Sequence, residues 1–553
     1  MSADILIRNG NVIDGSGEAG CRADVVIAGD RIADVGSFPD ARASRVIDAS
    51  GRAVAPGFID VHSHAEFNLA SPTHHQTMEP FVRQGITTMV TGNCGVSPAP
   101  LGSESADYFT SYFECLLPEK GLAWDWVSFA EFLEKVEDAR PILNMGQLVG
   151  HGTLRLNAMG FSPKRAGAVA LASMRAAVRR ALEEGALGIS YGLGYIPGLW
   201  APTDELIEVA RDLPDHGGRI SVHLRGQTVF IEEAVEEMIA VAETVGAPLQ
   251  ISHFAPFGEE YFEGFFRAHG RIEKARDRGL EIGYDILTYA TSSTTLLSVY
   301  PMWMFEGGLA RFLALLREPD VRERVVRDLS EQEPRWPSWE TGTAPDRKGR
   351  LAGGDGPAWG DYRLHGFRKP ENRGYEGRDL AAIADSLGRG ILETLFDLTL
   401  EEEGRLFYTA SSHDDDELDR KLGLLFALPD MSCMTDSVGI GLRTPHPSIY
   451  GVFPRLLGKH VREWRNLSLE EAVRRCTALP AAQMGIRDRG TLRRGAFADV
   501  VVFDPETVID RASFADPRQY PVGIETVIVN GVPVWHEGVW HGEAPAGRVL
   551  RAG

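Results

Sequence analysis

Short runs of alternating apolar and polar residues begin the chain, and this alternation predicts β-strands. Residues 4–13 and 23–36 each contain two such runs separated by a turn signal, Asn9-Gly10 in the first and Gly29-Asp30 in the second. Residue pairs of this kind favour tight hairpins, because they tolerate the left-handed backbone that two-residue turns require. We therefore expect a β-hairpin in each of the two ranges.

The same pattern returns near the other end of the chain, in residues 494–535, where Asn530-Gly531 gives a further hairpin signal. Two β-rich, turn-rich ends predict one small β-sandwich domain that is built from residues 1–57 and 486–553. These ends would flank a large central domain formed by residues 58–485.

The central domain alternates apolar strands with helical patterns, which is typical of strand–helix units and a parallel sheet. About seven or eight such units fit in it. This number predicts an α/β fold of the (β/α)8 TIM-barrel type, in which the chemistry lies at the carboxyl ends of the strands. Beyond the first strand, the predicted strands lie in residues 85–92, 141–151, 219–226, 248–254, 281–294 and 425–437, and predicted helices include residues 165–185 and 231–246.

Two segments of the central domain lack this periodicity. Residues 331–378 are rich in glycine, proline, tryptophan and charge. A long segment without periodicity is often a functional lid, so we expect a lid or insertion over the mouth of the barrel. Residues 103–128 carry a second group of aromatic side chains, for which packing in a loop cap is favoured over substrate recognition.

The net charge and the cysteine usage limit the cellular compartments and the binding partners that we expect for the protein. The formal net charge is −21, which disfavours binding to the phosphates of nucleic acids. The sequence shows neither the apolar run of a membrane span nor the first residues of a signal peptide. Its five cysteines are irregularly spaced, as expected in a reducing compartment. We therefore expect a cytoplasmic protein that binds neither nucleic acid nor membranes.

A His-x-His pair provides the first candidate for chemistry. The apolar run from Phe58 to Val61 reads as a short strand, and His62 and His64 follow it directly. Alternate residues of an extended chain project from the same face, so the two imidazoles can share one cation. Neutral imidazole is a common zinc ligand, and a zinc site usually needs three or four donors.

Further donors stand at the ends of later predicted strands. Taken alone, each has an ordinary explanation: a buried thiol is usually inert, a histidine can be a core residue, and an aspartate can cap a helix. Together with the His-x-His pair they favour a metal site. An aspartate beside such a site can accept a proton from water and pass it to a leaving amine. These donors are Cys94, His223, His253 and Asp436.

The chain resembles the amidohydrolase superfamily, and within it the N-acyl-D-amino-acid deacylases, also called D-aminoacylases. The resemblance extends over essentially the whole chain. It implies a zinc-dependent hydrolase with a barrel and a small β domain. The matching stretches include GFIDVHSH, GITTMVTGNCGVSPAP, LVGHGTLR, GALGISYGLGYIPG, SVHLRG, ISHF, PHPSIYGVFPRLLG and ADVVVFDPETVID.

The resemblance also implies a role for each donor. Cys94, His223 and His253 would hold a tightly bound Zn²⁺. His62 and His64, with Cys94 and Asp436, would form a weaker second site, and Asp436 would act as the catalytic base and then the acid. Many superfamily members bridge two metals with a lysine, but no lysine between the histidine pair and His223 stands at a predicted strand end. Substrate-binding positions implied by the resemblance are Tyr195, Tyr289, Arg225 and His151.

Three departures from the deacylase pattern concern the substrate. Ala255 stands where these enzymes have a lysine, Ser448 where they have an arginine, and Leu287-Thr288-Tyr289 replaces a Tyr-Pro-Tyr sequence. A guanidinium or ammonium group is a natural partner for the α-carboxylate of an N-acyl amino acid. Its loss makes an N-acyl amine or an anilide without that carboxylate an alternative substrate.

The sequence therefore predicts a zinc-dependent hydrolase of a linear amide C–N bond. A deaminase or cyclic-amide hydrolase of the same superfamily is the alternative, although the bridging lysine and the added strand-end glutamate typical of those enzymes are not evident. A metal-free scaffold protein derived from such an enzyme is disfavoured, because all six donors are present.

Overall fold

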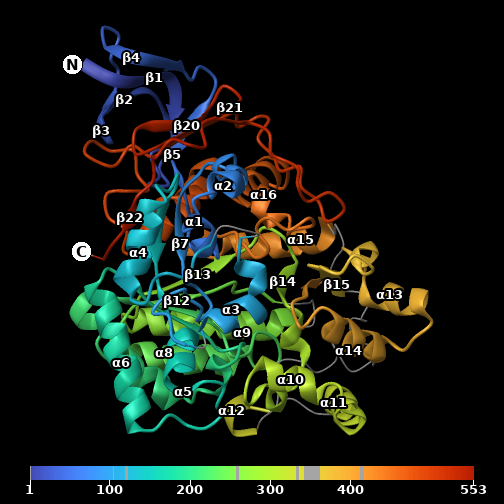
Figure 1. Cartoon of the computed structure of the whole chain (residues 1–553). Coiled ribbons are helices and arrows are strands. Elements are labelled where there is room, and N and C mark those ends of the chain that lie inside the picture. The colour runs from blue at the N-terminus through green and yellow to red at the C-terminus, as the bar shows by residue number, and fades with distance from the viewer. Residues whose placement is uncertain are drawn as a thin grey trace.

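The computed structural model describes residues 2–103, 105–118, 122–256, 261–331, 335–341, 362–410 and 416–552. These residues form a mixed α/β structure in which one sheet contains strands from both end regions of the chain and parallel strands occupy the centre (Figure 1). Within this part of the chain, no helix is both long and apolar enough to cross a bilayer.

Strands from the two chain ends pair in one nine-stranded sheet. The sheet runs in the order β21-β20-β19-β18-β5-β1-β2-β3, and β4 pairs with β1. The antiparallel pairing of β5 with β18 joins the ends, which confirms that they share a sheet; the sandwich packing stays a prediction. The strands are β1 (Ser2–Val12), β2 (Cys21–Ala28), β3 (Arg31–Gly36), β4 (Arg42–Asp48), β5 (Ala53–Pro56), β18 (Val500–Phe503), β19 (Ile524–Val529), β20 (Val532–His536) and β21 (Val539–Trp540).

The hairpin predicted at Asn9-Gly10 is wrong. Strand β1 continues through these residues, with only a shift of register between Ile7 and Gly10 and a positive φ of 62° at Asn9. Glycine is required there because a Cβ on Gly10 would lie 2.4 Å from Cγ2 of Val54 on the neighbouring strand. The predicted turns between β2 and β3 and between β19 and β20 are present.

Parallel strands form two further sheets in the centre. One has the order β17-β13-β12-β11-β10-β9 and the other the order β22-β8-β7-β6. Their residues are buried on both faces, which explains the nearly continuous apolar sequence of these strands. The strands are β6 (Phe58–Asp60), β7 (Ile86–Thr91), β8 (Asn144–Gln147), β9 (Val149–Gly150), β10 (Gly188–Gly192), β11 (Arg219–His223), β12 (Leu249–Ile251), β13 (Ile282–Ile286), β17 (Met431–Cys433) and β22 (Val549–Leu550).

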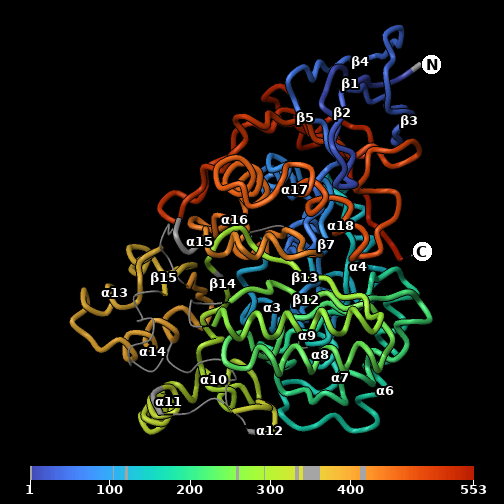
Figure 2. Tube along the Cα trace, turned by 180° about the vertical axis from the view of Figure 1, so that it is seen from behind, coloured from blue at the N-terminus to red at the C-terminus, as the bar shows by residue number. Residues whose placement is uncertain are grey.

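Helices connect these strands and cover them. In Figure 2 α6, α7, α8 and α9 lie around the outside of the parallel strands, and consecutive members of this series pack on one another. The helix predicted for residues 165–185 is α6. The bounds are α4 (Phe129–Asp138), α5 (His151–Met159), α6 (Ala168–Glu183), α7 (Thr203–Ala210), α8 (Ile231–Val245), α9 (Phe262–Asp277), α16 (Ser448–Arg455), α17 (Leu469–Cys476) and α18 (Ala478–Gln483).

The last strand of the chain leaves the nine-stranded sheet. Strand β22 runs parallel to β8, with Val549 opposite Met145 and Leu550 opposite Gly146. The end of the predicted small domain therefore also belongs to a sheet of the central domain. Arg548 O accepts a hydrogen bond from the backbone N–H of Met145 at 2.9 Å.

A layer of helices and a small antiparallel sheet lies to one side of the parallel strands (Figure 1). It has its own apolar cluster, into which Tyr108 and Phe109 of α3 (Ser105–Ser111) are buried, so these aromatics pack as favoured by their pattern. The lid predicted for residues 331–378 falls partly outside the described residues. The elements of this layer are β14 (Ser292–Thr295), β15 (Tyr362–His365), β16 (Phe407–Ala410), α10 (Leu309–Leu315), α11 (Pro319–Glu331), α12 (Ser338–Thr341), α13 (Leu380–Leu387) and α14 (Ile391–Glu401).

Candidate metal centre

Six metal-donor side chains stand where parallel strands end. His223 is the last residue of β11, and the other five donors follow β6, β7, β12 and β17 within a few residues. Because parallel strands present their carboxyl ends on one side, these donors meet there. They form two groups that share one member: His62, His64, Cys94 and Asp436, and Cys94, His223 and His253.

In the group of Cys94, His223 and His253, the two imidazoles lie beside the sulfur of Cys94. Its Sγ lies 3.8 Å from Nδ1 of His223 and 3.7 Å from Nε2 of His253. A tetrahedral zinc ion with Zn–S of about 2.3 Å and Zn–N of about 2.0–2.1 Å holds its ligand atoms roughly 3.6 Å apart. The observed separations therefore fit one zinc ion between these donors.

The second group contains the His-x-His pair. Cys94 Sγ lies 3.4 Å from Nε2 of His62, and Asp436 Oδ1 lies 3.4 Å from Nε2 of His62 and 3.5 Å from Nε2 of His64. These spacings also match ligand atoms around one ion. The same sulfur thus belongs to both groups, which makes Cys94 the bridging residue.

The backbone is strained at three of the donors. Positive φ angles of 52° at Cys94, 36° at His253 and 44° at Asp436 place non-glycine residues in the left-handed region. Such conformations cost roughly 1–3 kcal/mol each and cluster at functional sites. The turn after Cys94 is also crowded, since a Cβ on Gly95 would lie 2.4 Å from the backbone nitrogen of Gly192.

The charges of the site favour the ionised forms of two donors, the thiol of Cys94 and the carboxyl of Asp436. Burial opposes ionisation of Cys94, but the positive charge of His62 and hydrogen bonds from His223 and His253 hold the pKa of the thiol well below its usual range. Burial likewise opposes ionisation of Asp436, and the charge of His62 and the hydrogen bond of His64 nevertheless lower its pKa to about 2. Thiolate and carboxylate are the forms that bind metals.

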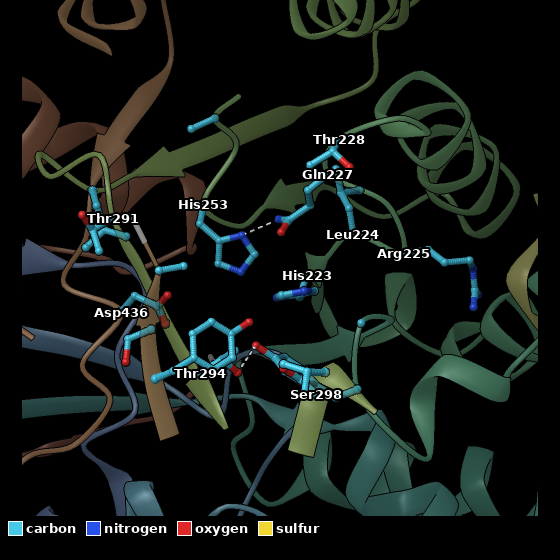
Figure 3. Close-up of a pocket in the computed structure, with 18 of the residues that line it drawn as sticks. His223, Leu224, Arg225, Gln227, Thr228, His253, Thr291, Thr294, Ser298 and Asp436 are labelled. Atoms are coloured by element: carbon cyan, nitrogen blue, oxygen red, sulfur yellow. Dashed lines mark hydrogen bonds between the residues drawn. The ribbon is translucent and has the colours of Figure 1, made fainter. Parts of the chain in front are cut away.

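Several residues around the donors were not found by sequence reasoning. Asp285 of β13 accepts a hydrogen bond from the backbone N–H of His253 at 2.7 Å, and its carboxylate lies 3.5 Å from Nδ1 of His62. Gln227 contacts Nδ1 of His253 at 2.6 Å (Figure 3). Only Asp285 left a signal in the sequence, as a carboxylate within an otherwise apolar strand.

Glu66, two residues after the His-x-His pair, has an unusual environment. Its side chain is fully buried, and neither carboxylate oxygen has a hydrogen-bond partner. One of these oxygens lies 3.9 Å from Nδ1 of His64. Burying a carboxylate without a hydrogen-bond partner costs free energy. A cation bound by His64 would make the imidazole ring more positive and would offset this cost.

A cavity of about 220 Å³ opens beside the metal centre, with His223, His253 and Asp436 in its wall. Both predicted tyrosines line it. The ring centroid of Tyr195 lies 4.7 Å from that of His223, and its hydroxyl accepts a hydrogen bond from Thr294 at 2.9 Å. Tyr289 donates its hydroxyl proton to Asp510 at 3.0 Å.

The other two predicted substrate-binding residues are occupied by protein partners. Arg225 lines the cavity, but its guanidinium is buried and donates hydrogen bonds to Glu237 and to two backbone carbonyl oxygens. His151 lies 3.0 Å from Glu205 and is absent from the described lining of the cavity. The structure therefore pairs each of these side chains with a buried glutamate and brings neither to the donors.

Comparison with known sequences identifies the family of this chain. The sequence pattern of the family described as "Amidohydrolase family" matches residues 45–333 and 424–535. These ranges include all six donors. The chain belongs to the amidohydrolase family. The expected family resemblance is therefore confirmed.

Relatives match the amidohydrolase over its full length. A D-aminoacylase of Alcaligenes xylosoxydans xylosoxydans is 34% identical over 99% of this chain and 97% of the relative, and an N-acyl-D-glutamate deacylase of the same organism is 33% identical over 99% and 96%. The solved N-acyl-D-glutamate deacylase of Bordetella bronchiseptica, complexed with zinc and a phosphonate inhibitor, has a TM-score of 0.79 at 31% identity and covers 100% of both chains.

Similarity to the alternative enzyme classes is weaker. An adenine deaminase of Listeria monocytogenes matches only 16% of this chain. An L-hydantoinase of Arthrobacter aurescens has a TM-score of 0.55 at 15% identity, which shows a shared fold alone. The deaminase and cyclic-amide alternatives are therefore not favoured.

Proposed function

We propose that this amidohydrolase uses zinc to hydrolyse the linear amide bond of an N-acyl compound, releasing a carboxylic acid and an amine. The observation that carries the proposal is the single sulfur of Cys94 shared by two donor groups, with Asp436 in one of them and in the cavity wall. The full-length relatives are named as deacylases of D-amino acids, which supports the reaction class.

We further infer that the two parallel sheets close into the predicted (β/α)8 barrel. After β17, the backbone N–H of Asp436 donates to the carbonyl oxygen of His62 at 3.0 Å, next to the end of β6. On the other side, β8 and β9 are separated only by Leu148, so that one run of chain pairs with both β7 and β10. These contacts support closure at both seams.

The domain boundaries and the compartment belong to the same proposal. The pairing of β5 with β18 supports a small domain from residues 1–57 and 486–553, beside a central domain of residues 58–485. All five cysteines are free thiols, which supports a reducing compartment such as the cytoplasm.

The donor groups suit two different roles. Cys94, His223 and His253 would hold the tightly bound zinc, since a thiolate with two imidazoles is a favoured zinc donor set. His62, His64, Cys94 and Asp436 would form the weaker second site. Bound zinc would polarise the amide carbonyl and make hydroxide available from water near neutral pH.

Asp436 would transfer a proton from the attacking water to the departing nitrogen. Its low pKa keeps the carboxylate ionised at neutral pH, so Oδ1 can accept a proton from the attacking water. The same oxygen would then return this proton to the departing nitrogen. The contacts with Nε2 of His62 and His64 hold the carboxylate in the cavity wall during both transfers.

Tyr195 is placed to donate a hydrogen bond to the substrate. Burial and the charge of Cys94 raise the pKa of its phenol well above the usual range, so the hydroxyl keeps its proton. A preorganised donor of this kind stabilises the negative charge that develops on a carbonyl oxygen. Tyr289, held by Asp510, would shape the neighbouring wall of the cavity.

The direct test is hydrolysis by the zinc-loaded protein. We expect release of amine from N-acyl substrates, loss of this activity after removal of metal with a chelator, and recovery on addition of zinc. Amine release is measured with a fluorogenic amine reagent and bound zinc by atomic emission. Zinc-loaded protein that releases amine from no N-acyl amino acid, N-acyl amine or anilide would contradict the proposal.

Glu66→Gln should weaken the second metal site. The buried carboxylate faces Nδ1 of His64, and removing such an outer partner typically lowers metal affinity about 10–100-fold. We expect zinc titration by calorimetry to show at least about a tenfold weaker second site and an unchanged first site. Because the unpaired charge is removed, the metal-free variant should be no less stable than the wild type in thermal unfolding. Equal affinity of both proteins for the second ion would refute this role.

A further inference from the structure

We infer that the cavity selects N-acyl amines whose amine part is apolar and uncharged, rather than N-acyl amino acids with a free α-carboxylate. The inference rests on the proposed amide hydrolysis and names its substrate class. It is carried by the charges of the cavity wall and by the partners of the cations nearest to it.

One part of the cavity wall comes from the layer of helices and is apolar. It is formed by the short helical turns η5 (Leu296–Val299) and η6 (Met302–Phe305) that follow β14. The polar groups nearby are neutral hydroxyls, among them Thr294 and Ser298. The apolar side chains that line this part are Leu297, Val299, Tyr300, Met302 and Phe305.

Arg225 is the only lysine or arginine among the described residues that line the cavity, and each nitrogen of its guanidinium donates a hydrogen bond to the protein. Its Nε and Nη2 donate to Glu237, Nη1 donates to Leu199 O, and Nη2 also donates to Ala201 O. The guanidinium stacks on the ring of Trp339 at 4.2 Å. Figure 3 shows the side chain turned away from His223 and His253.

A second arginine, Arg455 of α16, also has partners within the protein. It lies behind Tyr289, with the guanidinium carbon 4.7 Å from the ring centroid. It forms ion pairs with Asp419 and, at 3.1 Å, with Asp510, and it donates a hydrogen bond to Thr288 O at 3.0 Å. With two carboxylates around it, this arginine presents no net positive charge to the cavity.

Apart from Arg225, the described residues of the cavity wall include no lysine or arginine that could pair with a substrate carboxylate. A carboxylate of the substrate would therefore enter a wall in which the described residues offer it no unpaired cation, which is strongly unfavourable. An apolar group on the amine nitrogen gains free energy in the same place.

The test compares substrates that differ only in the carboxylate. N-acetylphenethylamine is N-acetylphenylalanine without its carboxylate, and N-acetyl-3-methylbutylamine bears the same relation to N-acetylleucine. We expect kcat/KM of the zinc-loaded wild type to be at least tenfold higher for each amine derivative than for either enantiomer of the corresponding acid. A D-acid hydrolysed as fast as its amine derivative, or faster, would overturn the inference but support the proposed amide hydrolysis. Failure with every amide would overturn both.

A second experiment places a positive charge in the cavity. Ala255 lines the cavity two residues beyond His253, so Ala255→Lys should supply the missing cation. We expect the ratio of kcat/KM for N-acetyl-D-phenylalanine to that for N-acetylphenethylamine to rise at least tenfold. Ala255→Met, of similar length and without charge, is the control and should leave this ratio within about twofold of the wild type. An equal change of the ratio in both variants would overturn the electrostatic basis of the selection.

Discussion

Asp436→Asn should lose turnover while keeping zinc bound to Cys94, His223 and His253. Asparagine has nearly the same shape as aspartate but cannot accept a proton and return it, and a positioned acid–base group contributes about 10²–10⁴-fold to rate. We therefore expect kcat to fall at least about 10³-fold. The measurement combines steady-state kinetics with zinc analysis, so that loss of chemistry is separated from loss of the ion.

A surface variant serves as the control for Asp436→Asn. Asp204 lies on α7, its side chain is 70% exposed, and Asp204→Asn should keep the wild-type kcat. The proposed proton carrier would be wrong if Asp436→Asn retained more than a tenth of the wild-type kcat. Loss of the tightly bound zinc from the variant would instead assign Asp436 to the holding of the first ion.

Cys94→Ser should lose metal from both donor groups. A serine hydroxyl stays protonated at neutral pH and is a poor zinc ligand, and Sγ of Cys94 is the one atom common to the two groups. We expect the zinc content of the purified variant to fall below about a tenth of that of the wild type, together with its activity. Zinc that binds the native state raises its stability, so added zinc should raise the Tm of the wild type and leave that of the variant unchanged.

Cys115→Ser is the matched control for this variant. Cys115 is also buried, but it belongs to neither donor group, and its replacement should keep the wild-type zinc content. Cys94→Ser protein that binds as much zinc as the wild type would contradict the shared-donor arrangement. Thermal unfolding of both metal-free variants shows whether the substitutions themselves disturb the fold.

The donors could be predicted from the sequence because their arrangement follows from local rules. His62 and His64 share a face through the two-residue repeat of an extended chain, and the other donors stand at strand ends, which a parallel sheet brings to one side. Helix α6 was predicted for a similar reason, since its apolar spacing is a property of one continuous segment.

The remaining features depend on partners that are distant in the sequence. Asn9-Gly10 has the composition of a turn, but close packing against Val54 uses the glycine inside a strand. The positive charge of Arg225 suggests carboxylate binding until Glu237 is seen beside it. The importance of Glu66 comes from the absence of any hydrogen bond to it, which no local pattern expresses.

The pairing of β5 with β18 has a consequence for the synthesis of the protein. Strand β5 ends at Pro56, whereas β18 begins only at Val500, so the ribosome must make the whole central domain between them. At about 5–20 residues per second, this delay is on the order of tens of seconds. During that time one edge of the first strands lacks its final neighbour, and exposed strand edges are sites of wrong pairing. The sheet that joins the two end regions can therefore be completed only after β18 has been synthesised.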